Sequence, residues 1–102
     1  MKVLPASLRA RLKELPRRPG VYLFKDREGR PVYIGKALSI QKRVAGHFRF
    51  YGSAASKESV MLSQVSRIDV IETPTEAEAL LLEASLVKEQ LPKYNEIGRA
   101  HV

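Results

Sequence analysis

The chain has 102 residues, 44% of them hydrophobic, a net charge of +7 and no cysteine. These values exclude a disordered segment, a disulfide framework and a thiolate metal site, and they predict one small globular domain. Because no apolar run approaches the roughly 20 residues of a membrane span and the N-terminus has no apolar signal core, we expect a cytoplasmic protein.

Charge is distributed unevenly along the chain. Residues 1–49 hold 13 Lys/Arg and 3 Asp/Glu, a net of +10, whereas residues 50–95 hold 4 and 7, a net of −3. Clustered cations on a small domain are typical of proteins that bind a phosphate backbone. Basic surfaces also serve membranes, acidic proteins and solubility, so charge favours nucleic acid without deciding it.

Hydrophobic periodicity and turn residues predict seven elements. In chain order they are a basic helix over 5–15, strands over 20–24 and 31–35 that form an antiparallel hairpin, a basic helix over 37–46, a helix over 58–67, a strand over 68–72 and a helix over 76–90. Thr75 and Glu78 form a capping box before the last helix, and Pro92 ends it. The fold class is therefore α/β, of the α+β type, with a three-stranded antiparallel sheet flanked by helices.

The hairpin carries two tyrosines. Side chains alternate along a strand, so Tyr22 and Phe24 share one face, and Tyr33 likewise opposes its aliphatic neighbours. We expect both tyrosines on a more open face of the sheet, opposite an aliphatic core face. A phenol there can donate, accept or deliver a proton, although Tyr is also simply a good strand residue. Gly35 at the predicted strand end leaves room for the backbone of a ligand.

A basic stretch follows the hairpin. Arg43 and His47 are four residues apart and share a face of the predicted helix. Arginine offers planar donors to a phosphate, and histidine can donate or shuttle a proton, but an exposed polar helix face has the same pattern. We expect Lys36, Lys42, Arg43 and Arg49 to contact DNA.

Glu83 has the most informative setting among the acidic residues. The positions three and four residues away, Ala79, Leu80, Leu86 and Val87, are apolar, so Glu83 lies on or beside the helix face that meets the sheet. A carboxylate there is costly unless it pairs with a cation, which is a structural role, or binds a divalent metal, which is a catalytic one. Both readings stay open, and a single Glu is sufficient for Mg²⁺, which keeps several waters.

With these residues in hand, the sequence resembles the GIY-YIG nuclease family, and its UvrC branch in particular. Gly20-Val21-Tyr22 and Tyr33-Ile34-Gly35 resemble the paired strands that name the family. The stretches Leu15-Pro16, Lys36-Ala37, Glu76–Ala84, Leu86-Val87-Lys88 and Pro92-Lys93-Tyr94-Asn95 follow the same order and spacing. The resemblance covers about residues 12–95.

The resemblance implies phosphodiester hydrolysis with one Mg²⁺ or Mn²⁺ ion. The site residues that it implies are Tyr22, Tyr33, Lys36, Arg43, His47, Glu83 and Asn95. In this reading Glu83 holds the metal, Arg43 neutralises charge on the phosphate, and either hairpin tyrosine orients or deprotonates the attacking water. His47 and Ser85 depart from the Tyr and Asn usual at their positions, and neither change removes a required group.

The resemblance also implies a place in nucleotide excision repair: the incision on the 3′ side of a DNA lesion. The expected partners are damaged double-stranded DNA loaded by UvrA and UvrB, with UvrB contacted through regions outside this chain, and we expect a monomer. The alternatives are a stand-alone or exonuclease-fused GIY-YIG nuclease and a non-catalytic DNA-binding module. The presence of Tyr22, Tyr33, Arg43 and Glu83 argues against the non-catalytic module.

The last seven residues, 96–102, read as foreign. The codons GAG-ATC-GGA-AGA-GCA-CAC-GTC-TGA encode them and a stop, and from the second base onward this DNA is the start of a widely used short-read sequencing adapter. We therefore expect a nuclease domain over 1–95, a natural protein that continues beyond it, and His47 as the only native histidine. A genomic reading frame that continued as Glu-Ile-Gly-Arg would contradict this expectation.

Overall fold

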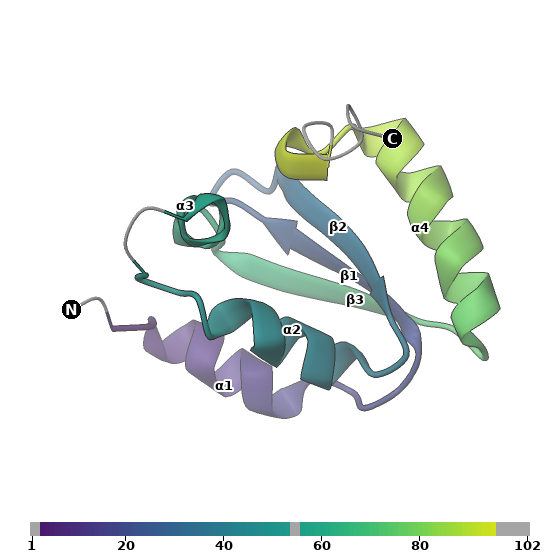
Figure 1. Cartoon of the computed structure of the whole chain (residues 1–102), viewed down its shortest axis with the longest axis horizontal. Helices are drawn as coiled ribbons and strands as arrows, with labels where there is room; N and C mark the ends of the chain where they lie inside the picture. Colours follow the sequence, from purple (N-terminus) through teal and green to yellow (C-terminus); the bar gives the residue numbers. More distant parts are fainter. Residues whose placement is uncertain (1–2, 54–55, 96–102) are drawn as a thin grey trace.

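A computed structural model describes residues 3–53 and 56–95, and the predicted foreign tail lies outside these residues. The elements are α1 (Ala6–Glu14), β1 (Gly20–Lys25), β2 (Pro31–Ala37), α2 (Ile40–Phe48), α3 (Lys57–Ser63), β3 (Arg67–Glu72) and α4 (Glu76–Gln90) (Figure 1). The three strands form one antiparallel sheet in the order β2-β1-β3. The predicted fold class is therefore confirmed.

Two helix boundaries differ from the prediction by three or more residues, and in each case a strand takes a residue that was assigned to the helix. Lys36 and Ala37 continue β2, so α2 begins at Ile40, where Ser39 caps it by accepting a hydrogen bond from the Lys42 amide. Arg67 pairs with Lys25 across the sheet, so α3 ends at Ser63 rather than at residue 67. The predicted cap of α4 is confirmed, since the Thr75 side chain accepts from the Glu78 amide.

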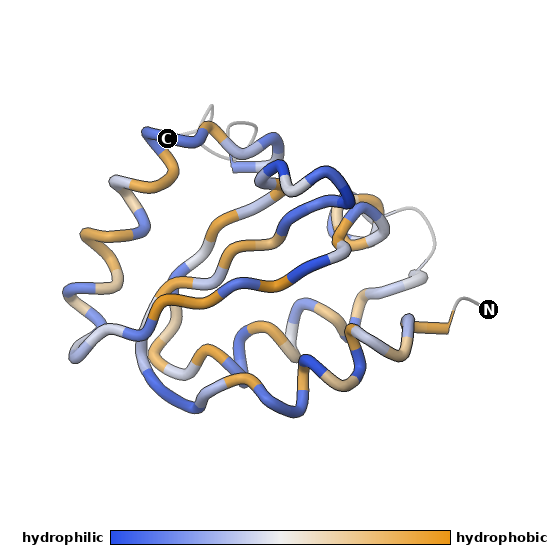
Figure 2. The backbone as a smooth tube through the Cα atoms, turned by 180° about the vertical axis from the view of Figure 1, so that it is seen from behind, coloured by the Kyte–Doolittle hydropathy of each residue, from blue (hydrophilic) through white to orange (hydrophobic). Residues whose placement is uncertain are grey.

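Helices cover both faces of the sheet, which forms two separate cores (Figure 1). On one face, α1, α2 and α3 cover Tyr22 and Phe24 with apolar residues that include Ile40, Val44 and Phe48. On the other face, α4 covers Val21, Leu23 and Ile34 with Ala79 and Val87. Figure 2 shows apolar residues running along the middle of the sheet, as a strand buried on both sides requires.

The prediction of an open tyrosine face was wrong. Tyr22 is 1% exposed and belongs to the larger of the two cores. The alternation of side chains was assigned correctly, but α2 carries its own apolar stripe and packs on the face that holds the tyrosines. Tyr22 and the half-buried Tyr33 both line the cleft described below.

Within the described residues, no helix combines the length and the apolar composition that a membrane crossing requires.

Candidate active site

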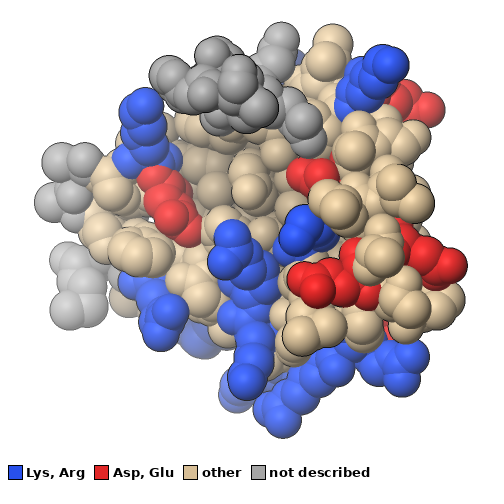
Figure 3. All heavy atoms as spheres, turned by 45° about the vertical axis from the view of Figure 1, so that its right-hand side comes forward, with Lys and Arg blue, Asp and Glu red and all other residues tan. Residues whose placement is uncertain are grey.

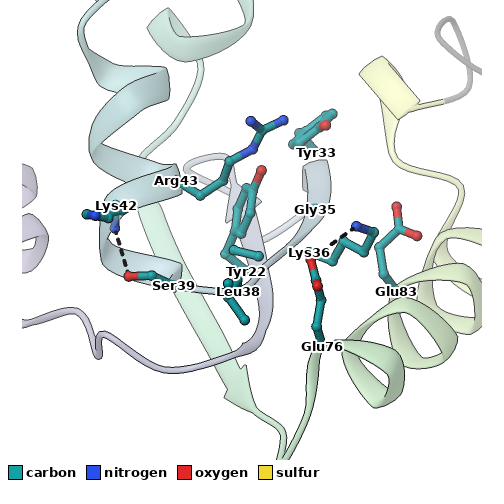
Figure 4. A pocket seen from close by; sticks show the side chains of 11 residues that line it. Tyr22, Tyr33, Gly35, Lys36, Leu38, Ser39, Lys42, Arg43, Glu76 and Glu83 are labelled. Carbon is teal, nitrogen blue, oxygen red and sulfur yellow. Dashed lines mark hydrogen bonds and ion pairs between the residues drawn. The ribbon is translucent and has the colours of Figure 1, made fainter.

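An open cleft of about 750 Å³ lies where β1 and β2 meet α2 and the inner side of α4 (Figure 4). Of the predicted site residues, it is lined by Tyr22, Tyr33, Lys36, Lys42, Arg43 and Glu83. His47 and Arg49 line a second pocket that shares Lys42 and Arg43 with the cleft. Asn95 lines neither pocket. Side chains drawn from four elements, far apart in the sequence, therefore meet at one place.

Gly35 is required by the tyrosine opposite it. The register of the hairpin pairs Tyr22 with Gly35, and a Cβ at Gly35 would overlap the Tyr22 hydroxyl. The prediction that Gly35 ends the strand was wrong, because β2 continues to Ala37. Gly35 lines the cleft, and room there for a ligand backbone stays a prediction. The glycine thus lets the phenol lie flat along β2 and point into the cleft.

The two phenols lie beside the guanidinium of Arg43. The ring centroids of Tyr22 and Tyr33 are 6.2 Å apart, and Figure 4 shows Arg43 reaching from α2 toward both rings. Burial raises the pKa of Tyr22, the neighbouring Tyr33 raises it further, and Arg43 opposes both effects. Burial likewise raises the pKa of Tyr33, again against Arg43. Both tyrosines are therefore neutral near pH 7, and either one needs an acceptor for its proton before it can act as a base.

His47 lies behind Tyr22 and has two polar partners. Its Nε2 is 2.8 Å from the Tyr22 hydroxyl, and its Nδ1 is 2.5 Å from Oε2 of Glu58 in α3. Its side chain is 11% exposed, so the alternative of a fully exposed polar helix face does not describe His47. Burial lowers the pKa of His47 more than Glu58 raises it, and the charge of Arg43 lowers it further. The imidazole is therefore neutral near pH 7.

The sequence did not indicate Glu58 as a site residue. It is separated from His47 by eleven positions, and the only local signal is an acidic residue in the first turn of a helix, which is common. Nothing in the sequence indicates that α3 folds back against α2 at this point.

Glu83 faces the cleft from α4, opposite the tyrosines (Figure 4). Ala79 and Val87 beside it are buried, as predicted, whereas Leu80 is 49% exposed, so the apolar stripe of α4 is narrower than expected. The charge of Glu83 reaches Tyr33, whose pKa it raises after the larger effects of burial and Arg43. A second carboxylate, Glu76, lines the same cleft and lies 4.0 Å from the Lys36 ammonium.

The donor set fits Mg²⁺ or Mn²⁺ better than a metal that needs a protein cage. Within residues 3–53 and 56–95, no three His, Cys, Asp or Glu side chains come together as a metal cluster. Glu83 instead offers carboxylate oxygens at the wall of an open cleft that has space for water and for phosphate oxygens. Hard cations that keep several waters bind in this way.

Asn95 holds the outer edge of β2. Its Oδ1 accepts a hydrogen bond from the Ile34 amide at 2.7 Å, and its Nδ2 donates to the Ile34 carbonyl at 2.7 Å. Leu91, with φ 48°, ends α4 before Pro92 and turns the chain back toward this edge. The amide of Asn95 therefore acts as a strand partner for the residue between Tyr33 and Gly35.

Basic side chains gather along one side of the cleft. Figure 3 shows lysines and arginines gathered in a band beside the carboxylates of α4. Lys42 and Arg43 join the cleft to the second pocket, where Arg49 adds a third cation. Glu58 lines the same second pocket, so the three cations share it with one carboxylate.

Comparisons with known proteins agree with this geometry. The profile of the UvrC-like GIY-YIG domain matches residues 18–96. The UvrABC system protein C of Nitratidesulfovibrio vulgaris is 48% identical over 88 residues, and that of Synechocystis is 45% identical over 91 residues. These matches cover 86% and 89% of this chain, but the chain spans only 13% and 14% of the length of those relatives.

Solved structures give the same result. The GIY-YIG N-terminal endonuclease domain of UvrC from Thermotoga maritima, bound to its catalytic magnesium, is 32% identical and superposes with a TM-score of 0.77 over 89% of this chain and 98% of that one. A point mutant of the same domain, bound to its catalytic divalent cation, gives a TM-score of 0.78. The phenol pair, the arginine and the carboxylate thus occur in a fold whose solved relatives bind a catalytic cation, and the chain belongs to the family of UvrC-like GIY-YIG domains.

Proposed function

We propose that this chain is a metal-dependent endonuclease domain that makes the 3′-side incision of damaged DNA in nucleotide excision repair. One observation carries the proposal: a single cleft gathers two phenols, an arginine and a helix-borne carboxylate, beside a basic band. The chain spans about one seventh of its relatives, with 13% and 14% covered, and we propose that the contacts with UvrB lie in regions outside it.

We assign a separate role in the reaction to each residue of the cleft. Arg43 faces the position of the scissile phosphate and stabilises negative charge on its non-bridging oxygens. Lys36, Lys42 and Arg49 hold the neighbouring phosphates. Glu83 holds Mg²⁺ or Mn²⁺, which when bound supplies Lewis-acid stabilisation of the leaving oxygen.

We assign to Tyr22, rather than to Tyr33, the role of accepting the proton of the attacking water. The Tyr22 hydroxyl has an acceptor for its own proton, His47 Nε2 at 2.8 Å. As the water gives its proton to the Tyr22 oxygen, the Tyr22 proton passes to Nε2, so a phenolate of raised pKa never has to accumulate. Tyr33, more exposed at the cleft wall, orients the water.

The role proposed for Asn95 differs from that of the cleft residues. Both polar groups of its side chain are already bonded to Ile34, and the side chain is 7% exposed. We therefore assign it the positioning of β2 and, through β2, of Tyr33.

The test of this function is incision of a lesion-bearing duplex loaded with UvrA and UvrB, in Mg²⁺ or Mn²⁺. The protein is the chain extended to its natural C-terminus, compared with Glu83→Gln and with the control Glu89→Gln on the exposed side of the same helix. We expect one 3′-side nick from the parent and the control and none from Glu83→Gln. Equal nicking by all three would refute the metal role of Glu83.

A non-catalytic DNA-binding module is the remaining candidate, and the same assay separates it from a nuclease. Its expected signature is DNA binding that depends on Lys42, Arg43 and Arg49 without any nick from the parent. Binding of Mn²⁺ that disappears in Glu83→Gln contradicts that candidate, because a module without chemistry has no use for the ion.

A further inference from the structure

Three side chains from three elements form a continuous chain of hydrogen bonds that ends in the cleft. The Glu58 carboxylate of α3 is 2.5 Å from His47 Nδ1 in α2, and His47 Nε2 is 2.8 Å from the Tyr22 hydroxyl of β1. Tyr22 lines the cleft, whereas Glu58 lies outside its lining. The hydrogen bonds therefore connect the carboxylate to the cleft through the imidazole, and its charge also acts on Tyr33 and Arg43.

The partners of His47 determine its tautomer. An ionised carboxylate only accepts hydrogen bonds, so Nδ1 must carry the hydrogen that joins it to Glu58. In a neutral imidazole the other nitrogen is then an acceptor, and the Tyr22 hydroxyl donates to Nε2. This is the one tautomer that can accept a proton from Tyr22.

The surroundings of His47 leave the Glu58 carboxylate as the group that stabilises a positive charge on the imidazole. The rings of Tyr22, Phe24 and Tyr33 each lie 5.5 Å from the imidazole by ring centroids, which limits its contact with water. The charged groups that face it are Arg43 on α2, which disfavours an imidazolium, and Glu58 on α3, which favours one. Lys42 and Arg49 stand at the rim of the same pocket. Glu58 is thus the anion placed to stabilise a charge on His47.

A purely structural reading of Glu58 explains less. The amide of Ser59 at the start of α3 is already satisfied by the Ser56 side chain, so Glu58 is not needed as a cap. An ion pair between α2 and α3 could form with the carboxylate in many orientations. Glu58, 33% exposed, instead directs its oxygen to Nδ1 of a residue whose other nitrogen meets a cleft tyrosine.

We propose that Glu58 is a positioning residue for strand scission: it fixes the Nδ1–H tautomer of His47 and stabilises the imidazolium formed when His47 takes the Tyr22 proton. The step balances, since water loses a proton to the Tyr22 oxygen, Tyr22 passes its own proton to Nε2, and the hydroxide that forms attacks phosphorus. The bond between phosphorus and the leaving oxygen then breaks, and that oxygen takes a proton from solvent water. The proposal rests on the nuclease function proposed above.

The first measurement is the tautomer of His47 by ¹⁵N NMR at pH 7.5, in the full chain and in Glu58→Gln, with His47→Gln to assign the signal against His101. We expect the Nδ1–H form in the parent. In Glu58→Gln the amide can donate to Nδ1, so the Nε2–H form becomes populated. An Nε2–H form in the parent, or the same tautomer in both proteins, would overturn the proposal without touching the metal role of Glu83.

The second measurement is the pH profile of nicking by the same variants. We expect Glu58→Gln to lose roughly 10- to 100-fold in rate, the range found when the partners that orient metal-bound histidines are removed. Its acid limb should move to lower pH, because Glu58 raises the pKa of His47. A lower rate with an unshifted limb means that Glu58 is merely structural. Absence of nicking in the parent overturns the nuclease function, and this role with it.

Two further variants complete the design. Glu58→Asp keeps the carboxylate on a stem one methylene shorter, so it should keep the Nδ1–H tautomer and recover part of the rate, and it decides the question if Glu58→Gln does not fold. Glu89→Gln removes the same charge from an exposed position and should leave both the tautomer and the profile unchanged. Loss of the tautomer in Glu58→Asp would count against the proposal.

Discussion

Replacing Asn95 with Ala separates a positioning role from a catalytic one. The change removes two hydrogen bonds of 2.7 Å and leaves the amide and the carbonyl of Ile34 without their side-chain partners at the edge of the sheet. Each lost bond costs about 1–2 kcal/mol when water replaces it incompletely, so we expect a loss of about 2–4 kcal/mol in the free energy of unfolding. For a domain of this size that corresponds to a fall of about 10–20 °C in Tm.

Thermal unfolding followed by circular dichroism measures this loss of stability. Nicking assayed well below the lowered Tm measures the effect of the substitution on the rate of the folded protein. We expect the folded fraction of Asn95→Ala to keep part of its activity, with a rate that falls as β2 becomes less well held. Asn95→Asp is the matched variant: it keeps the acceptor for the Ile34 amide but sets a carboxylate against the Ile34 carbonyl, so it should be no more stable than Asn95→Ala. An unchanged Tm with complete loss of nicking would refute the positioning role and return Asn95 to the reacting groups.

Three further predictions follow from the packing and the charges of the site. Gly35→Ala forces Tyr22 to move, so it should cost about 1–3 kcal/mol of stability and reduce nicking as well, both measurable in one preparation. Arg43→Lys should retain the fold but lose most of the activity, because an ammonium cannot offer planar paired donors to a phosphate; wild-type nicking by this variant would contradict the role. The folded pKa of His47 lies below its usual 6.5, so the unfolded chain binds more protons as pH falls below that value. The contribution of neutral His47 to stability is therefore fully present above pH 6.5 and is lost as pH falls through the lowered pKa of His47. His47→Gln should remove this part of the pH dependence. The parts due to Asp26 and Asp69 lie below pH 3.8.

The sequence predicted what local patterns control. The elements, the antiparallel hairpin and the inward position of Glu83 follow from periodicity, caps and breakers, and they agree with the structure. The pairing of Tyr22 with Gly35 and the burial of Tyr22 under α2 depend on which face each helix covers, and alternation along one strand does not carry that information.

Contacts between distant residues were the least predictable. Glu58 meets His47 because α3 folds back onto α2, and Asn95 meets Ile34 across 61 positions because α4 ends in a left-handed turn. The resemblance to a family identified Asn95 as a site residue, but only its contacts indicate what it does. Glu58 was found from the structure alone.

The cleft lies between the two hydrophobic cores, which share no residues. The tyrosines belong to the larger core, whereas Glu83 stands on α4, which packs on the sheet through the smaller core. Because separate cores hold Glu83 and the tyrosines, a local opening of either core is enough to move the proposed metal ligand away from the phenols. Loss of nicking on warming should therefore begin at or below the temperature at which the whole domain unfolds, and nicking and amide hydrogen exchange followed in one preparation compare the two temperatures.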